Sequence, residues 1–404
     1  MSNFSFIEKL LEGIEVEWKP LREVAEIKRG TSITKMNVVN GDVPVIAGGR
    51  TPAYYHNVSN RDGQTIVIAG SGAYAGFVSW WEQPIFVSDA FTVKPSEALL
   101  TRYCYHFLHN MQQQLHDFKS GGGVPHVYPR DVAPIPIPIP CPENPKKSLE
   151  IQAEIVRILD AFTELTAELT AELNARKKQY NYYRDNLLSF EGIDVEWQTL
   201  GEIGEFIRGK RFTKKDYVDD GGIKVIHYGE IYTHYGTSSA NAISQVRSDL
   251  AESLRYAETN DVIVTSVGET IEDVGKAVAW LGNEKVAIHD DSYAIRHSLN
   301  PKYLSYCLQT EGFIAEKAKH VSRGKVKRLL IDGMSKVRIP IPYPNNPEKS
   351  LAEQARIVSI LEKFDTLTSS ITEGLPREIE LRQKQYEYYR DLLLSFPKQE
   401  EVAA

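Results

Sequence analysis

The sequence predicts an α+β protein in which two mixed α/β domains are separated by two long helices that form an antiparallel coiled coil. The whole is arranged as an internal repeat with pseudo-twofold symmetry. Three observations predict this fold class. Long segments occur twice in the same order, two of them carry apolar residues at coiled-coil spacing, and the regions between them contain short apolar runs typical of buried strands.

The repeat consists of three pairs of segments that bracket two dissimilar regions. An Arg-Gly pair follows the opening segment in both copies, as Arg29 and Gly30 and again as Arg208 and Gly209. Matches of this length and order do not arise by chance, whereas the regions 30–130 and 209–335 share only a faint pattern. The matched segments are EGIEVEWKPLREVAEI (12–27) with EGIDVEWQTLGEIGEF (191–206), IPIPCPENPKKSL (137–149) with IPIPYPNNPEKSL (339–351), and KQYNYYRDNLLSF (178–190) with KQYEYYRDLLLSF (384–396).

These segments divide the chain into two variable domains and two fixed helices. A scaffold that stays constant while its two domains differ is suited to reading two different ligands. The predicted parts are a first variable domain (1–147), a first helix (148–190), a second variable domain (191–349), a second helix (350–396) and a flexible tail (397–404).

Each helix follows an alternating Ile-Pro run, at 134–142 and 340–347. Proline fixes φ and holds its predecessor in an extended conformation, so both runs are predicted to be stiff, non-helical connectors. Ser148 and Ser350 then stand where an N-cap belongs, and Ser350 with Glu353 matches a capping box.

Apolar residues along both helices follow the spacing of a coiled-coil seam. In the first helix the tetrapeptide TAEL occurs twice in tandem (166–173), which predicts a stutter that leaves the helix continuous. The second helix carries Gly374 and Pro376, which predict a kink or break. The residues expected at the seam or in subunit contacts are Leu165, Leu169, Leu173, Tyr180, Tyr183, Leu187, Tyr386, Tyr389 and Leu393.

Composition excludes several classes of protein. With 42 % hydrophobic and 25 % charged residues the chain is neither disordered nor fibrous, and it has no apolar run long enough to cross a membrane. The three cysteines (Cys104, Cys141 and Cys307) are far apart, which argues against a disulfide framework or a cysteine zinc site. These features indicate a soluble cytoplasmic protein. The net charge of −7 argues against nucleic-acid binding as a global sum, but the local field is set within about 10 Å.

Positive charge is concentrated in the variable domains. A glycine-rich or basic loop precedes the Ile-Pro run in both domains, and glycine allows close approach to a phosphate while Lys and Arg supply counter-charge or read guanine. We therefore predict DNA contacts in these loops, in the segment RGKRFTKK (208–215) and at Arg50. The predicted residues are Arg50, Lys119, Gly121, Gly122, His126, Arg130, Arg208, Lys210, Arg211, Lys214, Lys215, Arg323, Lys325, Lys327 and Arg328.

Signals for an enzyme are weaker. The loop between Gly70 and Gly76 has a dinucleotide-like glycine spacing, but the residues after it do not read as a helix. The segment 268–277 resembles a phosphate-binding loop but has the wrong spacing. His106 and His109 are i, i+3 neighbours with the spacing of a metal site, but the second domain has Leu308 and Glu311 at these positions. We therefore interpret them as a polar helix face, and no metal or catalytic residue is predicted.

The duplicated KQYxYYRDxLLSF helices, the Ile-Pro junctions and the GI[ED]VEW domain openings resemble the specificity subunit of a type I restriction-modification enzyme. The resemblance covers essentially the whole chain. It implies that each variable domain is a target-recognition domain for one half of a bipartite, asymmetric sequence of double-stranded DNA. It also implies that the two helices fix the unread spacer and dock two methyltransferase (modification) subunits. The base-reading residues do not carry over, because these domains differ among members.

The resemblance further implies a non-catalytic chain without a cofactor of its own. The modification subunits would bind S-adenosylmethionine and methylate adenine, and restriction subunits would add translocation and cleavage that use ATP and Mg. The residues alone leave two other functions open. One is a nucleotide- or S-adenosylmethionine-binding enzyme that uses the loop between Gly70 and Gly76, and the other is a coiled-coil scaffold with no role on DNA.

Overall fold

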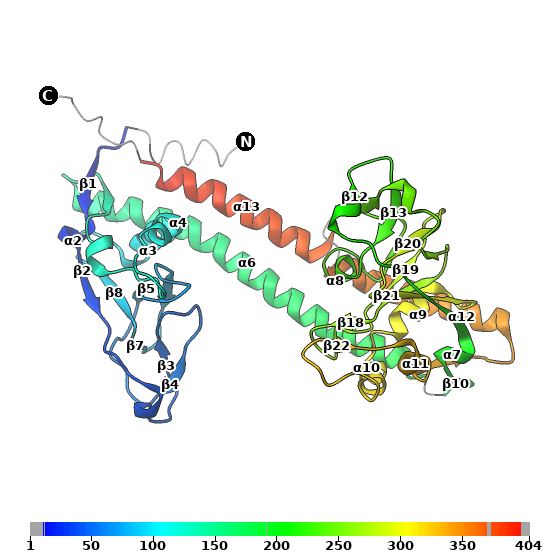
Figure 1. Ribbon diagram of the computed structural model, residues 1–404. Coiled ribbons are helices and arrows are strands. Elements are labelled where there is room, and N and C mark those ends of the chain that lie inside the picture. Colours follow the sequence, from blue (N-terminus) through cyan, green and yellow to red (C-terminus); the bar gives the residue numbers. More distant parts are fainter. Residues whose placement is uncertain (1–10, 12, 191, 370–372, 397–404) are drawn as a thin grey trace. The chain divides into compact units, whose positions relative to one another are not determined.

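A computed structural model describes residues 11, 13–190, 192–369 and 373–396, which form two compact units (Figure 1). The first unit combines the described residues up to Glu168 with those from Ile379 onward, and the second unit comprises Leu169–Glu378. The tail expected at 397–404 lies outside the described residues. No helix in the described ranges is both long enough and apolar enough to span a membrane.

The first unit contains three small sheets, with strand orders β2-β8-β5-β6, β4-β3-β7 and β1-β9. Strand β5 is buried along its whole length and lies between β8 and β6. The elements of its α/β domain are β1 (Val16–Pro20), α2 (Leu21–Val24), β2 (Ala25–Arg29), η1 (Lys35–Asn37), β3 (Val43–Ile46), β4 (Tyr54–His56), β5 (Thr65–Ala69), β6 (Val78–Trp81), β7 (Phe86–Val87), β8 (Ala90–Pro95), α3 (Thr101–Asn110), α4 (Gln112–Asp117), α5 (Pro129–Val132) and β9 (Pro136–Pro140).

The second unit repeats this plan with longer sheets, ordered β11-β21-β17-β19-β14 and β12-β15-β13-β20-β16, and with the pairs β10-β23 and β18-β22. Its elements are β10 (Val195–Thr199), α7 (Leu200–Ile203), β11 (Gly204–Arg208), η2 (Lys214–Asp216), β12 (Tyr217–Val218), β13 (Ile223–Ile226), α8 (Tyr228–Thr233), β14 (Ser238–Ser239), β15 (Ser244–Val246), η3 (Ser248–Leu250), β16 (Tyr256–Ala257), β17 (Val262–Thr265), β18 (Val267–Gly268), β19 (Ala277–Trp280), β20 (Val286–Ile288), β21 (Ser292–His297), α9 (Pro301–Cys307), α10 (Glu311–Ala318), β22 (Lys327–Arg328), α11 (Ile331–Met334) and β23 (Arg338–Pro342).

The Ile-Pro runs are extended, as predicted, but they are strands rather than bare connectors. Strand β9 pairs antiparallel with β1, and β23 pairs in the same way with β10. The run closes each domain by bringing its end back to its opening segment. A buried tyrosine fixes this closure in both units, because Tyr103 donates its hydroxyl hydrogen to the carbonyl of Pro138 and Tyr303 donates to that of Pro340.

The predicted N-caps are wrong by one turn. Helix α6 (Pro145–Leu187) and helix α12 (Pro347–Ser369) both begin at a proline. Asn144 Oδ1 accepts the amide hydrogen of Lys147, and Asn346 Oδ1 accepts that of Lys349, so asparagine caps both helices. Ser148 and Ser350 instead lie buried in the first turn, where each accepts a hydrogen bond from a glutamine four residues later.

The predicted continuity of the first helix and the break in the second are both confirmed. Helix α6 runs for 43 residues through both TAEL copies. The second fixed segment consists of α12, which ends at Ser369, and α13 (Gly374–Leu394). Gly374 has a φ of +75°, and a Cβ there would lie 2.5 Å from the carbonyl oxygen of Thr366. Only glycine adopts this conformation without strain, so it marks the point of separation.

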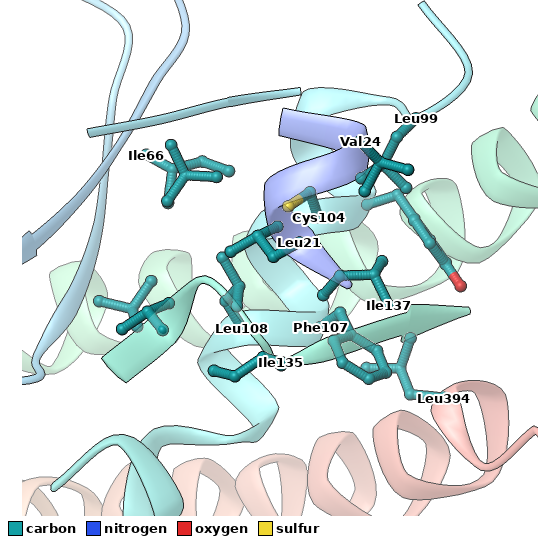
Figure 2. Packing of buried hydrophobic residues seen from close by; sticks show 14 of the residues in the cluster. Leu21, Val24, Ile66, Leu99, Cys104, Phe107, Leu108, Ile135, Ile137 and Leu394 are labelled. Carbon is teal, nitrogen blue, oxygen red and sulfur yellow. The ribbon is translucent and has the colours of Figure 1, made fainter. Parts of the chain in front are cut away.

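Each unit is completed by a helix end from the other repeat. Leu393, Leu394 and Phe396 belong to the hydrophobic core of the first unit, together with Ile155 and Leu159 of α6. Figure 2 shows Leu394 beside Phe107 in this core. Correspondingly, Tyr180 of α6 and Leu188, which directly follows α6, belong to the core of the second unit with residues of α12.

Aromatic pairs at equivalent positions hold these helix ends. Tyr389 stacks on Phe162 in the first unit with ring centroids 5.2 Å apart, and Tyr183 stacks on Phe364 in the second at 5.5 Å. Of the other predicted seam residues, Tyr386 and Leu187 pack against the cores, and Leu165, Leu169 and Leu173 are half-buried. The arrangement of the long helices as a coiled coil stays a prediction.

One buried residue differs between the two cores. Phe107 of α3 makes an edge-on contact with Trp18, with centroids 6.1 Å apart. The equivalent helix position in the second unit is Cys307, and a pocket of about 260 Å³ opens there beside Trp197, whose surface is 51 % exposed. The smaller side chain therefore leaves open a space that a phenylalanine ring fills in the first unit.

A lysine is buried beneath the loop that follows β18. Lys317 of α10 is 1 % exposed, and its Nζ donates hydrogen bonds to the carbonyl oxygens of Glu272 and Val274 at 2.9 and 2.6 Å. Burial lowers the pKa of Lys317 from 10.5 to about 8. The unfolded chain therefore binds one more proton than the folded chain between these two pH values.

Comparison with the variant Lys317→Met should show this linkage. The wild-type free energy of unfolding, relative to the variant, should rise as the pH increases from 8 toward 10.5, by at most about 1.4 kcal/mol per pH unit. Urea unfolding of both proteins across this window measures the difference. A difference that does not change with pH would show that the amine titrates as it does in water.

Candidate nucleic-acid interface

The Arg-Gly pair forms the same tight turn in both domains. The amide of Gly30 donates to the carbonyl of Ala90 at 2.9 Å, and the amide of Gly209 donates to that of Ser292 at 3.1 Å. A Cβ on Gly30 would lie 2.3 Å from Ser88 O, and one on Gly209 would lie 2.1 Å from His289 O. Close backbone packing therefore requires glycine here, and it directs the preceding arginine to the rim of a cleft.

The first cleft, of about 590 Å³, opens at this turn in the first domain. It includes one predicted DNA contact, His126, whose ring stacks on Tyr128 with centroids 5.7 Å apart. The guanidinium groups of Arg29 and Arg130 lie over the same tyrosine ring, at 5.4 and 4.7 Å from its centroid. The cleft is lined by Arg29, Gly30, Ser32, Ile33, Ala47, Ala53, Tyr54, Gly70, Ser88, Asp89, Ala90, Phe91, His126, Val127 and Tyr128.

The glycine-rich loop before the Ile-Pro run is a closed hairpin. Ser120 and His126 exchange backbone hydrogen bonds of 3.0 and 2.9 Å, and Gly121 and Gly122 are exposed at its tip. Lys119 is drawn back from solvent, because its Nζ donates to the carbonyl oxygen of Ala73 at 2.9 Å. Of these predicted contacts, the two glycines are freely accessible and the lysine is partly engaged.

The loop between Gly70 and Gly76 is occupied by its own hydrogen bonds. Its Gly70 amide donates to Asp89 O, its Gly72 amide to Pro125 O and its Gly76 amide to Ala69 O. The element that follows is the strand β6 rather than a helix. A dinucleotide site needs free amides at a helix N-terminus, so this geometry does not favour the cofactor-binding alternative. Arg50 packs over the Tyr74 ring of this loop, 4.8 Å from its centroid.

The second cleft, of about 580 Å³, opens at the equivalent turn of the second domain. It brings together three of the predicted contacts, Arg208, Lys210 and Arg211. Lys214 and Lys215 lie on η2 and do not line it. The lining residues are Glu205, Phe206, Ile207, Arg208, Gly209, Lys210, Arg211, Arg255 and Asp290.

The basic segment before β23 reaches the same turn from the other side. Arg328 lies on β22, and its Nη1 is 3.7 Å from Oδ1 of Asp291, the neighbour of the cleft residue Asp290. Lys327 pairs with Gly268 of β18, while Arg323 and Lys325 are exposed in the loop before it. The amide of Leu329 donates to Ser266 O, as that of Val127 donates to Gly70 O in the first domain. The two loops are therefore attached at equivalent points, as predicted.

Sequence reasoning missed several cleft residues. Arg29 and Tyr128 could have been found, since the first precedes a repeated glycine and the second lies within the loop already chosen. Arg255 and Asp290 carry no local signal, because strand pairing alone brings them to the cleft. Two exposed tyrosines on the fixed helices were also missed: Tyr182 (64 % exposed) and its repeat partner Tyr388 (50 %).

A histidine and two aspartates form a further cluster in the second domain. One ligand atom each of His289, Asp290 and Asp291 lies within 4.8 Å of the others. The Nδ1 atom of His289 already accepts the amide hydrogen of Asp291 at 3.2 Å. His227 and His297 each accept the backbone amide hydrogen of the residue two positions later in the same way. This local hydrogen bond is a turn geometry and does not indicate a metal site.

The interpretation of His106 and His109 as a polar helix face is wrong. His106 is fully buried, and its Nε2 lies 2.8 Å from the carboxylate of Asp160 on α6. Burial, together with the charge of Arg390, lowers the pKa of His109 to about 4. The equivalent positions in the second unit are Tyr306 and Gln309 rather than Leu308 and Glu311, as shown by the matching hydroxyl bonds of Tyr103 and Tyr303.

Comparison with known proteins identifies a family. Residues 14–177 and 193–381 match the type I restriction modification DNA specificity domain. The chain is 36 % identical to the type I restriction enzyme EcoR124I/EcoR124II specificity subunit of Escherichia coli over 430 aligned positions, which span 100 % of both chains. It is 35 % identical to the putative type I restriction enzyme specificity subunit S.HindORF215P of Haemophilus influenzae, over 98 % of this chain and 99 % of that one.

Solved structures share the fold at low sequence identity. The S subunit of a type I restriction-modification system from M. genitalium superposes with a TM-score of 0.59 and 16 % identity, over 96 % of this chain and 98 % of that one. A chain from a study of complex assembly and conformational transition in the type I R-M system matches equally well, with a TM-score of 0.59 and 16 % identity.

Proposed function

The chain belongs to the specificity subunits of type I restriction-modification enzymes, and on this premise we propose that each α/β domain reads one half of a bipartite DNA target through the cleft at its Arg-Gly turn. The observation that carries the proposal is the recurrence of one backbone turn with two different linings. The turn places Arg29 in the first cleft and Arg208 in the second, while the other lining residues differ. Two half-sites of different sequence require different base-contacting side chains, and these can be carried on the same backbone turn.

Electrostatics support DNA as the ligand in spite of the net charge of −7. Arg208, Lys210, Arg211 and Arg255 line the second cleft, and no carboxylate of the described residues lies within ion-pair distance of any of them. Unpaired cations at one site attract phosphates, and each phosphate contact releases counterions. The stacked His126 and Tyr128 with their two arginines give the first cleft a mixed aromatic and cationic wall.

The fixed helices complete the proposal as spacer and docking elements. We assign the docking of two modification subunits to the duplicated helix ends, where exposed Tyr182 and Tyr388 offer the same side chain at equivalent positions. Large exposed aromatic side chains are typical anchors of protein interfaces. S-adenosylmethionine would then be bound by the modification subunits, and ATP with Mg by the restriction subunits, while this chain supplies specificity.

Methylation mapping tests the proposal as a whole. The chain is co-expressed with the modification subunits of its own system, and methylated adenines are located across a genome. The expected pattern is an asymmetric sequence of two short parts with an unread spacer between them, and it should vanish when this chain is omitted. A contiguous recognition sequence, or methylation without this chain, would contradict the proposal.

Removing charge from the second cleft should weaken DNA binding and lower its salt dependence. For the double variant Arg208→Gln with Lys210→Gln, we expect the slope of log K against log salt to fall by about 0.9 for each lost phosphate contact. Fluorescence anisotropy of the assembled methyltransferase on its target measures the slope. The control variant Lys336→Gln with Lys363→Gln removes the same charge outside the cleft and should leave the slope unchanged. If both double variants lowered the salt dependence equally, the second cleft would not be part of the DNA interface.

A further inference from the structure

The loop against the Arg-Gly turn is one residue longer in the second domain. Gly30 packs against Ser88 O and Gly209 packs against His289 O, so Ser88 and His289 are equivalent. Two residues separate Ser88 from Phe91, the strand partner of Arg29, whereas three separate His289 from Tyr293, the strand partner of Arg208. Asp290 directly follows His289 and lines the second cleft beside the turn. A loop that differs in length and in side chains is where two homologous readers can differ in what they read.

The carboxylate of Asp290 is not used to neutralise the cations around it. Its Oδ1 lies 3.2 Å from Nδ1 of His289, but that nitrogen accepts the amide hydrogen of Asp291, and no Lys or Arg of the described residues lies within ion-pair distance of Asp290. Of the neighbouring acidic residues, Asp291 pairs with Arg328 at 3.7 Å, and Glu205 lies opposite Arg296 in the pairing of β11 with β21. Asp290 presents a carboxylate with free acceptor capacity to the cleft, and its side chain is 33 % exposed.

A free carboxylate is unfavourable beside DNA phosphates unless it meets a hydrogen-bond donor, because like charges repel at close range. Carboxylates can only accept hydrogen bonds. In the major groove, the donors are the exocyclic amines of cytosine and adenine, whereas guanine and thymine present acceptors at the corresponding edge. Ser88 has a hydroxyl that both donates and accepts, and its Oγ already accepts the amide hydrogen of Ile33 at 3.2 Å.

We propose that Asp290 is a specificity-determining residue of the second domain: it accepts a hydrogen bond from the amine of a cytosine or adenine and rejects guanine and thymine at that position. This inference rests on the proposed function, since it names one base contact of the cleft assigned above. The cations of the cleft hold the phosphates and set the register, and Asp290 discriminates between bases within that register.

The test compares methylation by the complete methyltransferase carrying wild-type chain, Asp290→Asn or Asp290→Ala. Initial rates are measured on a set of duplexes that differ at each base of the target. In the wild type, one position of the half-site read by the second domain should require cytosine or adenine. In both variants the rates on guanine and thymine at that position should rise toward the cognate rate, closing a gap on the order of tenfold to a hundredfold. The other positions should keep their preferences.

Asp291→Asn is the matched control, because it removes the same charge from the adjacent residue, which pairs with Arg328. It should leave base preference unchanged. Asp290→Asn is nearly isosteric, so it carries the test if Asp290→Ala does not fold. Unchanged discrimination in both Asp290 variants, or relaxation in the half-site read by the first domain, would overturn the inference while leaving the bipartite pattern intact. Loss of that pattern in the wild-type enzyme would instead reject the proposed function.

Discussion

Deletion of one TAEL tetrapeptide from α6 should yield an enzyme that recognises both original half-sites with a spacer shorter by one or two base pairs. Helix α6 continues without interruption through both copies. Removing four residues shortens it by about 6 Å, which is close to two base-pair steps of about 3.4 Å. Methylation mapping of the deletion variant with its partner subunits measures the spacer directly. Methylation at the original target should be lost almost completely, because a helix cannot stretch to restore the missing turn.

A length-preserving variant separates the effect of distance from that of sequence. Thr170→Ala alters the second tetrapeptide without changing the number of residues, and alanine favours helix. It should methylate the wild-type target. A deletion variant that keeps the original spacer would show that the helix does not set the distance, whereas an altered half-site would show that it contributes to base reading.

Gly209→Ala should weaken reading of one half-site and leave the other intact. The added Cβ would lie 2.1 Å from the carbonyl oxygen of His289 and 2.4 Å from that of Ile288, so the backbone beneath the second cleft must shift. The backbone shift forced by such overpacking lowers the stability of the native conformation by roughly 1–3 kcal/mol. If the shift falls on the interface, affinity for the second half-site should drop by about tenfold to a hundredfold. Binding to duplexes in which only one half-site is correct, with the other scrambled, separates the two contributions.

Gly30→Ala is the counterpart in the first domain, where the Cβ would lie 2.3 Å from Ser88 O. It should affect the opposite half-site. Gly312→Ala serves as the control, since Gly312 lies on α10 outside the cleft and no atom lies within 4 Å of its Cβ position. If both Arg-Gly variants impaired the same half-site, the assignment of one cleft to each half would be wrong.

The parts of the fold that local patterns determine were predictable from the sequence. Apolar spacing located both long helices, and Gly374 located the break in the second, because backbone conformation there depends on one residue type. The capping residue was misplaced because the sequence offers two capping candidates, an asparagine before the first proline of the helix and a serine one turn later. Asn144 before Pro145 forms the cap, and Ser148, four residues after Asn144, accepts a hydrogen bond inside the helix instead.

The candidate interface was only partly predictable, for a physical reason. Charge runs and repeated glycines are local, so Arg208, Lys210 and Arg211 were found. Arg255 and Asp290 reach the same cleft through pairing of distant strands, which leaves no pattern along the chain. His106 was misinterpreted for the same reason, since its partner Asp160 lies 54 residues away on another helix. A burial state that depends on a distant partner cannot be inferred from spacing alone.

Leu393, Leu394 and Phe396 are among the last described residues of the chain, yet they belong to the core of the first domain. During synthesis, the first domain must therefore leave the ribosome with part of its apolar surface uncovered, and it stays incomplete until α13 has also been made. A premature stop before α13 would damage the domain that was made first. The first recognition domain therefore becomes fully stable only after the second domain and both long helical segments have been synthesised.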